Sequence, residues 1–308
     1  MKPRIIVLGS SNTDMVIKAD HLPGKGETII GGNFFMYPGG KGANQAVAAS
    51  RLGGRVTLIS KIGTDLFGKA TLKVFEEEGI NTAFVFQDPD HASGIALITV
   101  DKDGDNCIVV ASGANARLLP SDLLDATEAI NEVSLVLMQL ESPLETVNYV
   151  AACAFKKGAR IILNPAPSVP LEDELLSKIS ILTPNLKEAE ALSGLIITDL
   201  NTAGLAARKL AERGPATIII TMGNQGVQVY DKGILTHIPV PEVIAVDSTA
   251  AGDVFNGALA VGLADGLSLL EAARFAVQAA AISVTKMGAQ SSAPYKVEVE
   301  ELQRVKAG

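Results

Sequence analysis

The sequence predicts an α/β fold in which a doubly wound, mostly parallel central sheet is flanked by helices and accompanied by a small antiparallel β-sheet. Three observations lead to this prediction. Short apolar runs without polar alternation recur along the chain, as in parallel strands that are buried on both faces. Amphipathic stretches of helical length lie between these runs, and alternating strands and helices build parallel sheets. Two further regions carry strand-like pieces outside this alternation, which indicates a second sheet.

Five short runs that are rich in Ile, Leu and Val are predicted to be strands of the central sheet. In chain order they span residues 5–8, 135–140, 161–163, 181–182 and 218–220. Each run is followed by a polar or Gly-rich turn. Ligands of doubly wound sheets bind beyond the carboxyl ends of the strands. We therefore expect the polar residues of these turns to meet at one edge of the sheet.

Helices are predicted between the strands from apolar periodicity and from the residues that end them. The predicted helices span 69–78, 143–157 and 202–213, with further ones at 43–50 and from about Asp253 onward. Each of the first three is followed immediately by a glycine, and glycine favours the left-handed conformation that ends many helices.

The second sheet is predicted from a hairpin and from three short strand-like pieces. Residues 94–100 and 106–110 flank a turn that is rich in Gly and Asp. The short pieces lie at 15–17, 28–30 and 34–36. We expect one domain over residues 1–308, with segments of about 14–37 and 92–111 forming a lid over the strand ends. An open sheet face needs cover, so the lid is also a predicted dimer contact.

Composition excludes several classes of function. The chain has 308 residues, of which 47% are apolar, and its net charge is 26 − 34 = −8. Nucleic-acid binding usually needs a basic surface, so we expect none. Cys107 and Cys153 show no metal-binding or disulfide spacing. No apolar run is long enough for a bilayer span or a signal segment, and we expect a cytoplasmic protein without a membrane partner.

The strongest local signal lies around Asp253, where Ala250-Ala251-Gly252 precedes an apolar helix. Small residues leave the first backbone N–H groups of a helix open, and such a helix start binds anions. A carboxylate at the same point can accept a proton from a hydroxyl group held there, as phosphoryl transfer requires. Alternatively, Asp253 is only the N-cap of the helix, because Asp is a preferred capping residue.

A second signal is the glycine-rich segment Pro38-Gly39-Gly40-Lys41-Gly42-Ala43-Asn44-Gln45-Ala46. Glycines allow the backbone to approach a ligand closely, and Lys41 and Asn44 offer groups of the kind that bind sugar hydroxyls. The spacing differs from a Walker A loop, since Gly42 stands where a Mg²⁺-binding hydroxyl is needed. The alternative interpretation is a tight turn before a helix.

Weaker signals follow other predicted strands. Thr221–Val227 indicates either a phosphate-contacting turn or an ordinary hairpin. Asn185 and Glu188 form either a capping box or part of a Mg²⁺ site. Three polar side chains after strands, which together favour a polyol pocket, are those of Asn12, Asp14 and Glu141.

Residues 39–46 and 247–257 resemble the two signatures of the PfkB-type carbohydrate kinases, the ribokinase family. Shorter similar segments lie in family order at 9–14, 138–145, 164–167, 183–190 and 286–290, so the resemblance spans essentially the whole chain. It implies ATP-dependent phosphorylation of D-ribose at the 5-hydroxyl, which gives D-ribose 5-phosphate and ADP. Related family members that act on deoxyribose, fructose, a nucleoside or a sugar acid are the alternative.

The resemblance also implies a role for each matching residue. Asp253 is the general base, and the anion hole is formed by Ala250, Ala251 and Gly252. The sugar is bound by Asn12, Asp14, Gly40, Lys41, Gly42, Asn44, Glu141 and Asp253. The nucleotide is contacted by Asn185, Thr221, Gly223, Asn224, Gly226, Gly252 and Val277, although some members have a His at the position of Val277.

Cofactors are implied in the same way. Mg²⁺ accompanies ATP, with Glu188 placing it indirectly. K⁺ is expected as an activating cation near Asp247, Thr249, Ser283, Lys286, Gly288 and Ser292. The sequence departs from the family pattern at Ser248, which replaces a usual Thr, and at Ser291, which replaces a common Pro.

Two other classes remain as hypotheses. A non-catalytic sugar or nucleotide sensor could share the fold, but the intact Gly252 and Asp253 argue against it. A dinucleotide oxidoreductase would need Gly-x-Gly-x-x-Gly after the first strand, where residues 9–14 read Gly-Ser-Ser-Asn-Thr-Asp instead.

Overall fold

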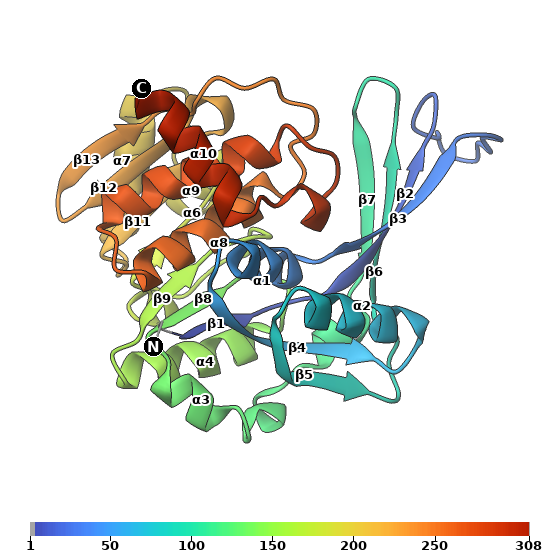
Figure 1. The fold of residues 1–308 in the computed structure, drawn as a ribbon, viewed down its shortest axis with the longest axis horizontal. Coiled ribbons are helices and arrows are strands. Elements are labelled where there is room, and N and C mark those ends of the chain that lie inside the picture. The colour runs from blue at the N-terminus through green and yellow to red at the C-terminus, as the bar shows by residue number, and fades with distance from the viewer. Residues whose placement is uncertain (1–3, 308) are drawn as a thin grey trace.

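The computed structural model describes residues 4–307 of the chain and contains two β-sheets (Figure 1). The main sheet has nine strands in the order β13-β12-β11-β10-β9-β8-β1-β4-β5, and the small sheet has four in the order β3-β2-β6-β7. The strands are β1 Arg4–Leu8, β2 Asn12–Lys18, β3 Asn33–Gly39, β4 Arg55–Gly63, β5 Asn81–Asp88, β6 Gly94–Val100, β7 Asn106–Ala111, β8 Leu135–Met138, β9 Arg160–Leu163, β10 Ile181–Leu182, β11 Thr217–Thr221, β12 Val227–Asp231 and β13 Ile234–Ile238.

The main sheet is parallel from β11 to β5 and ends in two antiparallel strands, β12 and β13. The predicted fold class is therefore confirmed, as are the five predicted central strands. β1 lies between β8 and β4, where the strand order reverses. A crevice opens at such a reversal beyond the carboxyl ends of the strands, which places the polar turns after β1 and β8 at its centre.

Helices cover both faces of the main sheet. They are α1 Lys41–Arg51, α2 Leu66–Glu77, α3 Thr127–Glu132, α4 Leu144–Lys156, α5 Asp173–Leu176, α6 Leu186–Ser193, α7 Leu200–Ala211, α8 Ala251–Ala264, α9 Leu269–Ser283 and α10 Lys296–Ala307. Alternate residues of β1 separate the two cores. Ile5 and Val7 pack with α1, α8 and α9, whereas Ile6 and Leu8 pack with α4, α6 and α7.

Several helices begin a few residues before their predicted starts: α1, predicted at 43–50, begins at Lys41, and α7, predicted at 202–213, begins at Leu200. The helix predicted at 69–78 begins at Leu66, because Asp65 accepts a hydrogen bond from the Gly68 N–H and caps it. The helix predicted from about Asp253 begins at Ala251, so Asp253 lies within its first turn. The predicted helices at 143–157 and 202–213 correspond to α4 and α7.

The small sheet projects from the carboxyl edge of the main sheet (Figure 1). Its outer pairs, β2–β3 and β6–β7, are antiparallel, but its central pair, β2–β6, is parallel. The physical reason is that β2 follows β1 and β6 follows β5, and both leave the parallel sheet in the same direction. The strand predicted at 28–30 is wrong. Ile30 is 95% exposed and the next two residues, both glycines, have positive φ, so nothing there is buried by pairing.

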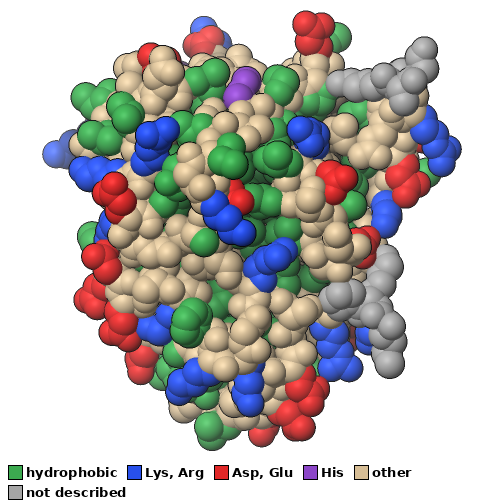
Figure 2. Space-filling view, turned by 90° about the vertical axis from the view of Figure 1, so that its left-hand side faces the viewer, with side chains coloured by type: hydrophobic (Ala, Val, Ile, Leu, Met, Phe, Trp, Pro, Cys, Tyr) green, Lys and Arg blue, Asp and Glu red, His purple; other side chains and the backbone are tan. Residues whose placement is uncertain are grey.

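The surface carries both signs of charge. On the face shown in Figure 2, Lys and Arg side chains lie interspersed with Asp and Glu side chains. Within residues 4–307, no helix combines the length and the apolar character that crossing a membrane requires. Residues 1–3 and 308, which complete the predicted 1–308 domain, lie outside the described residues.

Candidate active site

Asp253 is held by two side-chain amides from α1. Asn44 Nδ2 donates to Asp253 Oδ2 at 3.0 Å, and Gln45 Nε2 donates to Asp253 Oδ1 at 2.9 Å. The carboxylate is buried, on the third residue of α8, and Ala250 occupies the N-cap position. The capping interpretation of Asp253 is therefore wrong. Its carboxylate accepts from side chains of α1 and caps no N–H group of its own helix.

A carboxylate only accepts hydrogen bonds, so it fixes the orientation of the Asn44 amide. Asn44 must present its NH₂ group to Asp253, and its Oδ1 then points elsewhere. Asn44 Oδ1 is buried and has no partner among the described residues. A buried acceptor without a partner costs free energy unless a ligand satisfies it. The arrangement fits a ligand hydroxyl that donates to Asn44 Oδ1 close to the Asp253 carboxylate.

The start of α8 is open. Ala250 adopts a left-handed conformation with φ 60°, which is strained for a residue with a side chain and recurs at functional sites. In the described chain, the N–H groups of Gly252 and Asp253 have no protein acceptor. A Cβ at Gly252 would meet nothing within 4 Å. These donors and this space provide a place for an anion.

Lys41 lies among four carboxylates. The negative charges of Asp253, Glu141, Glu188 and Asp14 act on its ammonium group. Burial alone would lower the pKa of Lys41, but these carboxylates outweigh it and raise the pKa above its usual value. The backbone N–H of Lys41 also donates to Glu141 Oε2 at 3.0 Å. Lys41 therefore stays charged and balances part of the negative charge of the site.

Burial and Lys41 act in opposite directions on Asp253. Burial raises the pKa of Asp253 above its usual value, and the Lys41 charge and the Asn44 and Gln45 amides oppose this rise. A raised pKa makes a carboxylate a stronger proton acceptor once it is ionised. The site therefore has the electrostatics of a general base.

One cavity of about 200 Å³ joins several of the predicted residues. Its lining residues are Lys41, Asn164, Ala166, Thr183, Asn185, Glu188, Thr221, Ser248, Ala250, Ala251, Gly252, Asp253 and Asn256. We call this space the catalytic cavity. It places the predicted base and anion hole beside two of the predicted nucleotide residues, Asn185 and Thr221.

The purely structural interpretations of the predicted nucleotide residues, a capping box and a hairpin turn, are also correct. Asn185 and Glu188 form a capping box at the start of α6, and β11 and β12 form a hairpin around Gly223–Gln225. Gly226 is required by this turn, since a Cβ there would lie 2.1 Å from the Ile238 carbonyl oxygen. Capping does not compete with ligand contact, because Asn185, Glu188 and Thr221 also line the catalytic cavity, whereas Gly223, Asn224 and Gly226 are not among its lining residues.

Val277 lies apart from the catalytic cavity. It is buried in α9 and borders a separate hollow of about 330 Å³ with His237, Pro239 and Arg274. His237 Nε2 lies 2.6 Å from the Gln225 carbonyl oxygen, which connects this hollow to the β11–β12 turn.

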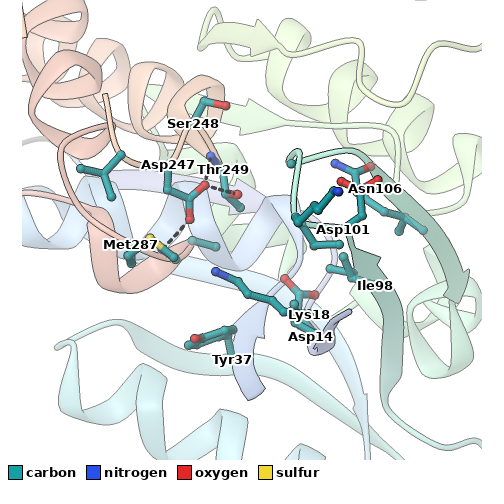
Figure 3. Close-up of a pocket in the computed structure, with 18 residues that line it drawn as sticks. Asp14, Lys18, Tyr37, Ile98, Asp101, Asn106, Asp247, Ser248, Thr249 and Met287 are labelled. Atoms are coloured by element: carbon teal, nitrogen blue, oxygen red, sulfur yellow. Dashed lines mark hydrogen bonds between the residues drawn. The ribbon is translucent and has the colours of Figure 1, made fainter. Parts of the chain in front are cut away.

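The predicted sugar residues of β2, Asn12 and Asp14, border two different cavities beside the small sheet. Asp14 lines a cavity of about 500 Å³, called here the inter-sheet cavity. Figure 3 shows Lys18 and Tyr37 near it on the small sheet, with Asp247 and Thr249 across the cavity. Asn12 and Glu141 line an adjoining hollow of about 560 Å³. Glu141 accepts hydrogen bonds from Ser10 Oγ and the Lys41 N–H, which connects this hollow to the start of α1.

The predicted cation residues are only partly together. Asp247 Oδ1 accepts from the N–H and Oγ1 of Thr249 at 2.9 and 2.6 Å, and Asp247 Oδ2 accepts from the Gly288 N–H at 2.9 Å. The Ser283 and Ser292 hydroxyls instead donate to carbonyls of their own turns. Lys286 Nζ pairs with Glu298 at 2.6 Å. Of the six predicted residues, only Asp247, Thr249 and Gly288 meet through side-chain hydrogen bonds.

Asp14 gives a first testable prediction. Burial and the nearby Glu141 and Asp253 charges raise the pKa of Asp14 from 3.8 to about 6. Its stabilising contribution is therefore complete below pH 3.8 and is lost as the pH rises through 6. We expect Asp14→Asn to raise the unfolding free energy of the ligand-free protein at pH 8 by at most about 3 kcal/mol. The gain should be absent near pH 4.

Thermal or urea unfolding at pH 4 and pH 8 checks this result. Asp105→Asn, in the exposed turn between β6 and β7, serves as the control and should leave stability unchanged at both pH values. A loss of stability in Asp14→Asn at pH 8 would contradict the electrostatic account of the site.

The sequence pattern of the pfkB family carbohydrate kinases matches residues 2–296. The chain belongs to this family. Members of this family are carbohydrate kinases, so the chain is a phosphotransferase.

Individual relatives of the pfkB chain agree with this assignment. A ribokinase from Haemophilus influenzae is 46% identical over 301 residues, which cover 98% of both chains. A deoxyribokinase from Salmonella typhi is 38% identical over 291 residues, which cover 94% of this chain and 95% of that protein. The structure of an Arabidopsis thaliana ribokinase complexed with ribose and ATP matches with a TM-score of 0.93 and 31% identity, over 98% of this chain and 99% of that one.

Several side chains of the site were not singled out from the sequence. Gln45 and Asn164 contact each other beside Asp253, and Lys18 faces Asp247 across the inter-sheet cavity (Figure 3). Gln45 stood within the glycine-rich segment and Asn164 directly after a predicted strand, so both positions carried a usable signal. Lys18 lay at the end of a strand of the small sheet and carried none.

Proposed function

We propose that this pfkB-family kinase transfers the γ-phosphoryl group of ATP to the 5-hydroxyl of D-ribose, which gives D-ribose 5-phosphate and ADP. One observation carries the proposal. The Asp253 carboxylate, the unpartnered Asn44 Oδ1 and the open N–H groups at the start of α8 adjoin one another. A hydroxyl group held at Asn44 is then next to both a base and a site for the transferring phosphoryl group.

The chemical step follows from this placement. The Asp253 carboxylate accepts the proton of the sugar hydroxyl as the hydroxyl oxygen bonds to the γ-phosphorus. The bond from the γ-phosphorus to the bridging oxygen breaks, and its electron pair leaves with ADP. The N–H groups of Gly252 and Asp253 and the positive end of the α8 dipole stabilise charge on the transferring group.

Sugar recognition is assigned to the residues around Lys41. Lys41 and the Asn44 amide offer donors and an acceptor, and Asp14, Glu141 and Asn12 offer further groups on either side of them. Such a mixture of charged and amide groups suits the hydroxyls of a small polyol. Gly39 leaves the room that Asp14 needs, since a Cβ there would lie 2.2 Å from Asp14 Oδ2.

The nucleotide and its ions are assigned by the same proposal. ATP lies across the catalytic cavity toward the β11–β12 turn, with Asn185, Thr221, Gly223 and Gly226 as its contacts. Mg²⁺ would neutralise charge on the phosphates. Glu188, whose oxygens already accept from Asn185, fits an indirect role in placing this ion.

K⁺ is proposed near Asp247. Two hydrogen bonds from Thr249 and one from Gly288 already satisfy this carboxylate. Burial acts against its ionisation, but these bonds and the Lys18 charge lower its pKa below the usual value. The lowered pKa favours the ionised form of Asp247, and a negative charge a few residues before the anion hole supports a nearby monovalent cation.

A sugar panel tests the function directly. ADP release is measured with ribose, deoxyribose, fructose, a nucleoside and a sugar acid, each with and without K⁺ at constant ionic strength. We expect the largest kcat/KM with ribose and an increase on addition of K⁺. A larger kcat/KM with deoxyribose would reassign the substrate, and equal rates in Na⁺ and K⁺ would remove the cation site from the proposal.

The small sheet is proposed to act as a lid and as a dimer contact. Its outward face carries exposed apolar side chains of Ile17, Phe34, Met36, Leu97 and Val109, which pair with one another or with neighbours across the strands. Such a face needs cover, and a second copy of the same sheet supplies it. Sedimentation that shows only monomers at micromolar concentration would contradict this proposal. The cytoplasmic location stays a prediction.

A further inference from the structure

Gln45 is a fully buried amide that joins three parts of the active site. It lies on α1 directly after Asn44 and is 0% exposed. Its Nε2 donates to Asp253 Oδ1 at 2.9 Å and to Asn164 Oδ1 at 3.2 Å, and its Oε1 accepts from Gln139 Nε2. Gln139 follows β8 and is also 0% exposed. The amides of Gln139 and Gln45 thus form a chain that ends on the catalytic carboxylate.

Asp253, the acceptor at which this series of hydrogen bonds ends, sets the orientation of both amides. Asp253 can only accept, so Gln45 presents its NH₂ group to it and its oxygen must face Gln139. Gln139 must therefore present its own NH₂ group to Gln45. Each amide has one orientation that satisfies its neighbour, and a rotated Gln45 would place an oxygen against the carboxylate.

We propose that Gln45 is a positioning residue for the general base, and that Gln139 holds Gln45 in the one amide orientation that can donate to Asp253. The inference rests on the proposed function, since it concerns the base of that reaction. Neither glutamine side chain is assigned a contact with sugar or nucleotide. Their effect passes through Asp253: they fix the carboxylate so that it faces the hydroxyl held at Asn44, and they favour its ionised form.

The pair of buried glutamine amides lowers the stability of the fold compared with an apolar core. Gln139 Oε1 is buried and has no partner among the described residues. Gly9 packs directly against it, since a Cβ at Gly9 would lie 2.1 Å from that oxygen. An unpaired buried acceptor destabilises a fold, and apolar side chains of equal size would avoid the cost. Both amides are present despite this cost, with Gln45 bonded to Asp253 and Gln139 bonded to Gln45.

The Gln45 amide acts among several charges that also reach Asp253. Lys41 on α1 is the cation of the site, and Asp14 on β2, Glu141 after β8 and Glu188 on α6 are the other carboxylates. Burial raises the pKa of Asp253, and donation from Gln45 opposes that rise. Loss of one such hydrogen bond to the ionised form should move the titration of the base upward by about one pH unit.

The test is the pH dependence of kcat with saturating ribose and ATP between pH 5 and pH 9. The variants are Gln45→Met and Gln139→Met, which keep the length of the side chain and remove the amide. Gln228→Met on β12 is the matched control, because Gln228 is a buried glutamine, 5% exposed, in another part of the main sheet. Ribose affinity and melting temperature are recorded for every variant.

We expect the acid limb of kcat to move upward by about one pH unit in Gln45→Met and by a smaller amount in Gln139→Met. The loss of activity should therefore approach, but not exceed, about tenfold at the acid end of the range and be largely recovered near pH 9, with little change in ribose affinity. Gln228→Met should keep the wild-type limb. If Gln45→Met does not fold, the shift in Gln139→Met decides the question, because that variant retains the Gln45 amide.

An equal loss of kcat at every pH, with the acid limb unmoved, would show a structural role and overturn the inference. Wild-type activity of both variants would also overturn it. Failure of the proposed function is a separate result: the wild-type protein itself would then release no ADP with any sugar of the panel.

Discussion

Asp253→Asn is expected to lower kcat by about 10²–10⁴, the usual effect of losing a general base, while the protein remains folded. The substitution keeps the shape of the side chain but removes the proton acceptor. It also places an NH₂ group against the Asn44 or Gln45 amide, each of which already donates to this position. We therefore expect one of these amides to rotate and ribose binding to weaken modestly. ADP release and ribose titration calorimetry measure the two effects.

Asp199 offers a matched control that separates capping from catalysis. Asp199 is a true N-cap, since its Oδ1 accepts from the Thr202 N–H at 2.8 Å at the start of α7. Asp199→Ala should lower the unfolding free energy by about 1 kcal/mol and leave kcat unchanged. Asp253→Asn should instead lower kcat strongly and leave the unfolding free energy nearly unchanged. Near-normal turnover in Asp253→Asn would remove this residue from the base role.

Lys41→Met is expected to give the second large effect, on both activity and stability. Lys41 balances Asp14, Glu141, Glu188 and Asp253, so its loss leaves four carboxylates without their shared cation. Removing one partner of a buried charge pair costs about 3–5 kcal/mol. Because protonation of the carboxylates relieves the repulsion, the destabilisation should be largest at pH 8 and should decrease toward pH 5.

Activity should fall in the same variant. Loss of a charged hydrogen-bond donor to the sugar lowers kcat/KM for ribose by about 10²-fold, and the acid limb of kcat should move to higher pH. Lys73→Met, on the exposed face of α2 with a side chain 75% exposed, is the control and should change neither quantity. A Lys41→Met protein with unchanged stability at pH 8 would show that the carboxylates do not depend on this cation.

The central sheet could be predicted because its signal is local. Runs such as 161–163 and 218–220 are buried on both faces and therefore contain few polar residues, which marks them in the sequence. The strand at 28–30 was wrong for a related reason: its apolar residues suggested burial, but the two glycines after it break the extended backbone. The parallel pairing of β2 with β6 joins residues about 80 positions apart in the chain, and no local pattern encodes it.

The sequence pointed to several residues that the structure brings together, but not to how they meet. A lone Asp before a helix favours a cap, and the small residues before Asp253 shifted the prediction toward a base. The deciding fact is that its carboxylate bonds to Asn44 and Gln45, which lie more than 200 positions earlier. Side-chain direction within a first helical turn depends on the neighbouring helix, and that neighbour is known only once α1 and α8 pack together.

The small sheet is joined to the active site by unusually short stretches of chain. Only Gly9, Ser10 and Ser11 separate β1 from β2, and Gly40 alone separates β3 from α1. Asp14 and Lys41 therefore lie close to the points where the small sheet joins the rest of the molecule, whereas Asp253 stands on α8. Under the proposed function, a displacement of the small sheet would move Asp14 relative to the sugar and leave Asp253 in place. We therefore expect substitutions far out on β2 or β3 to alter the choice of sugar more than the phosphoryl-transfer step.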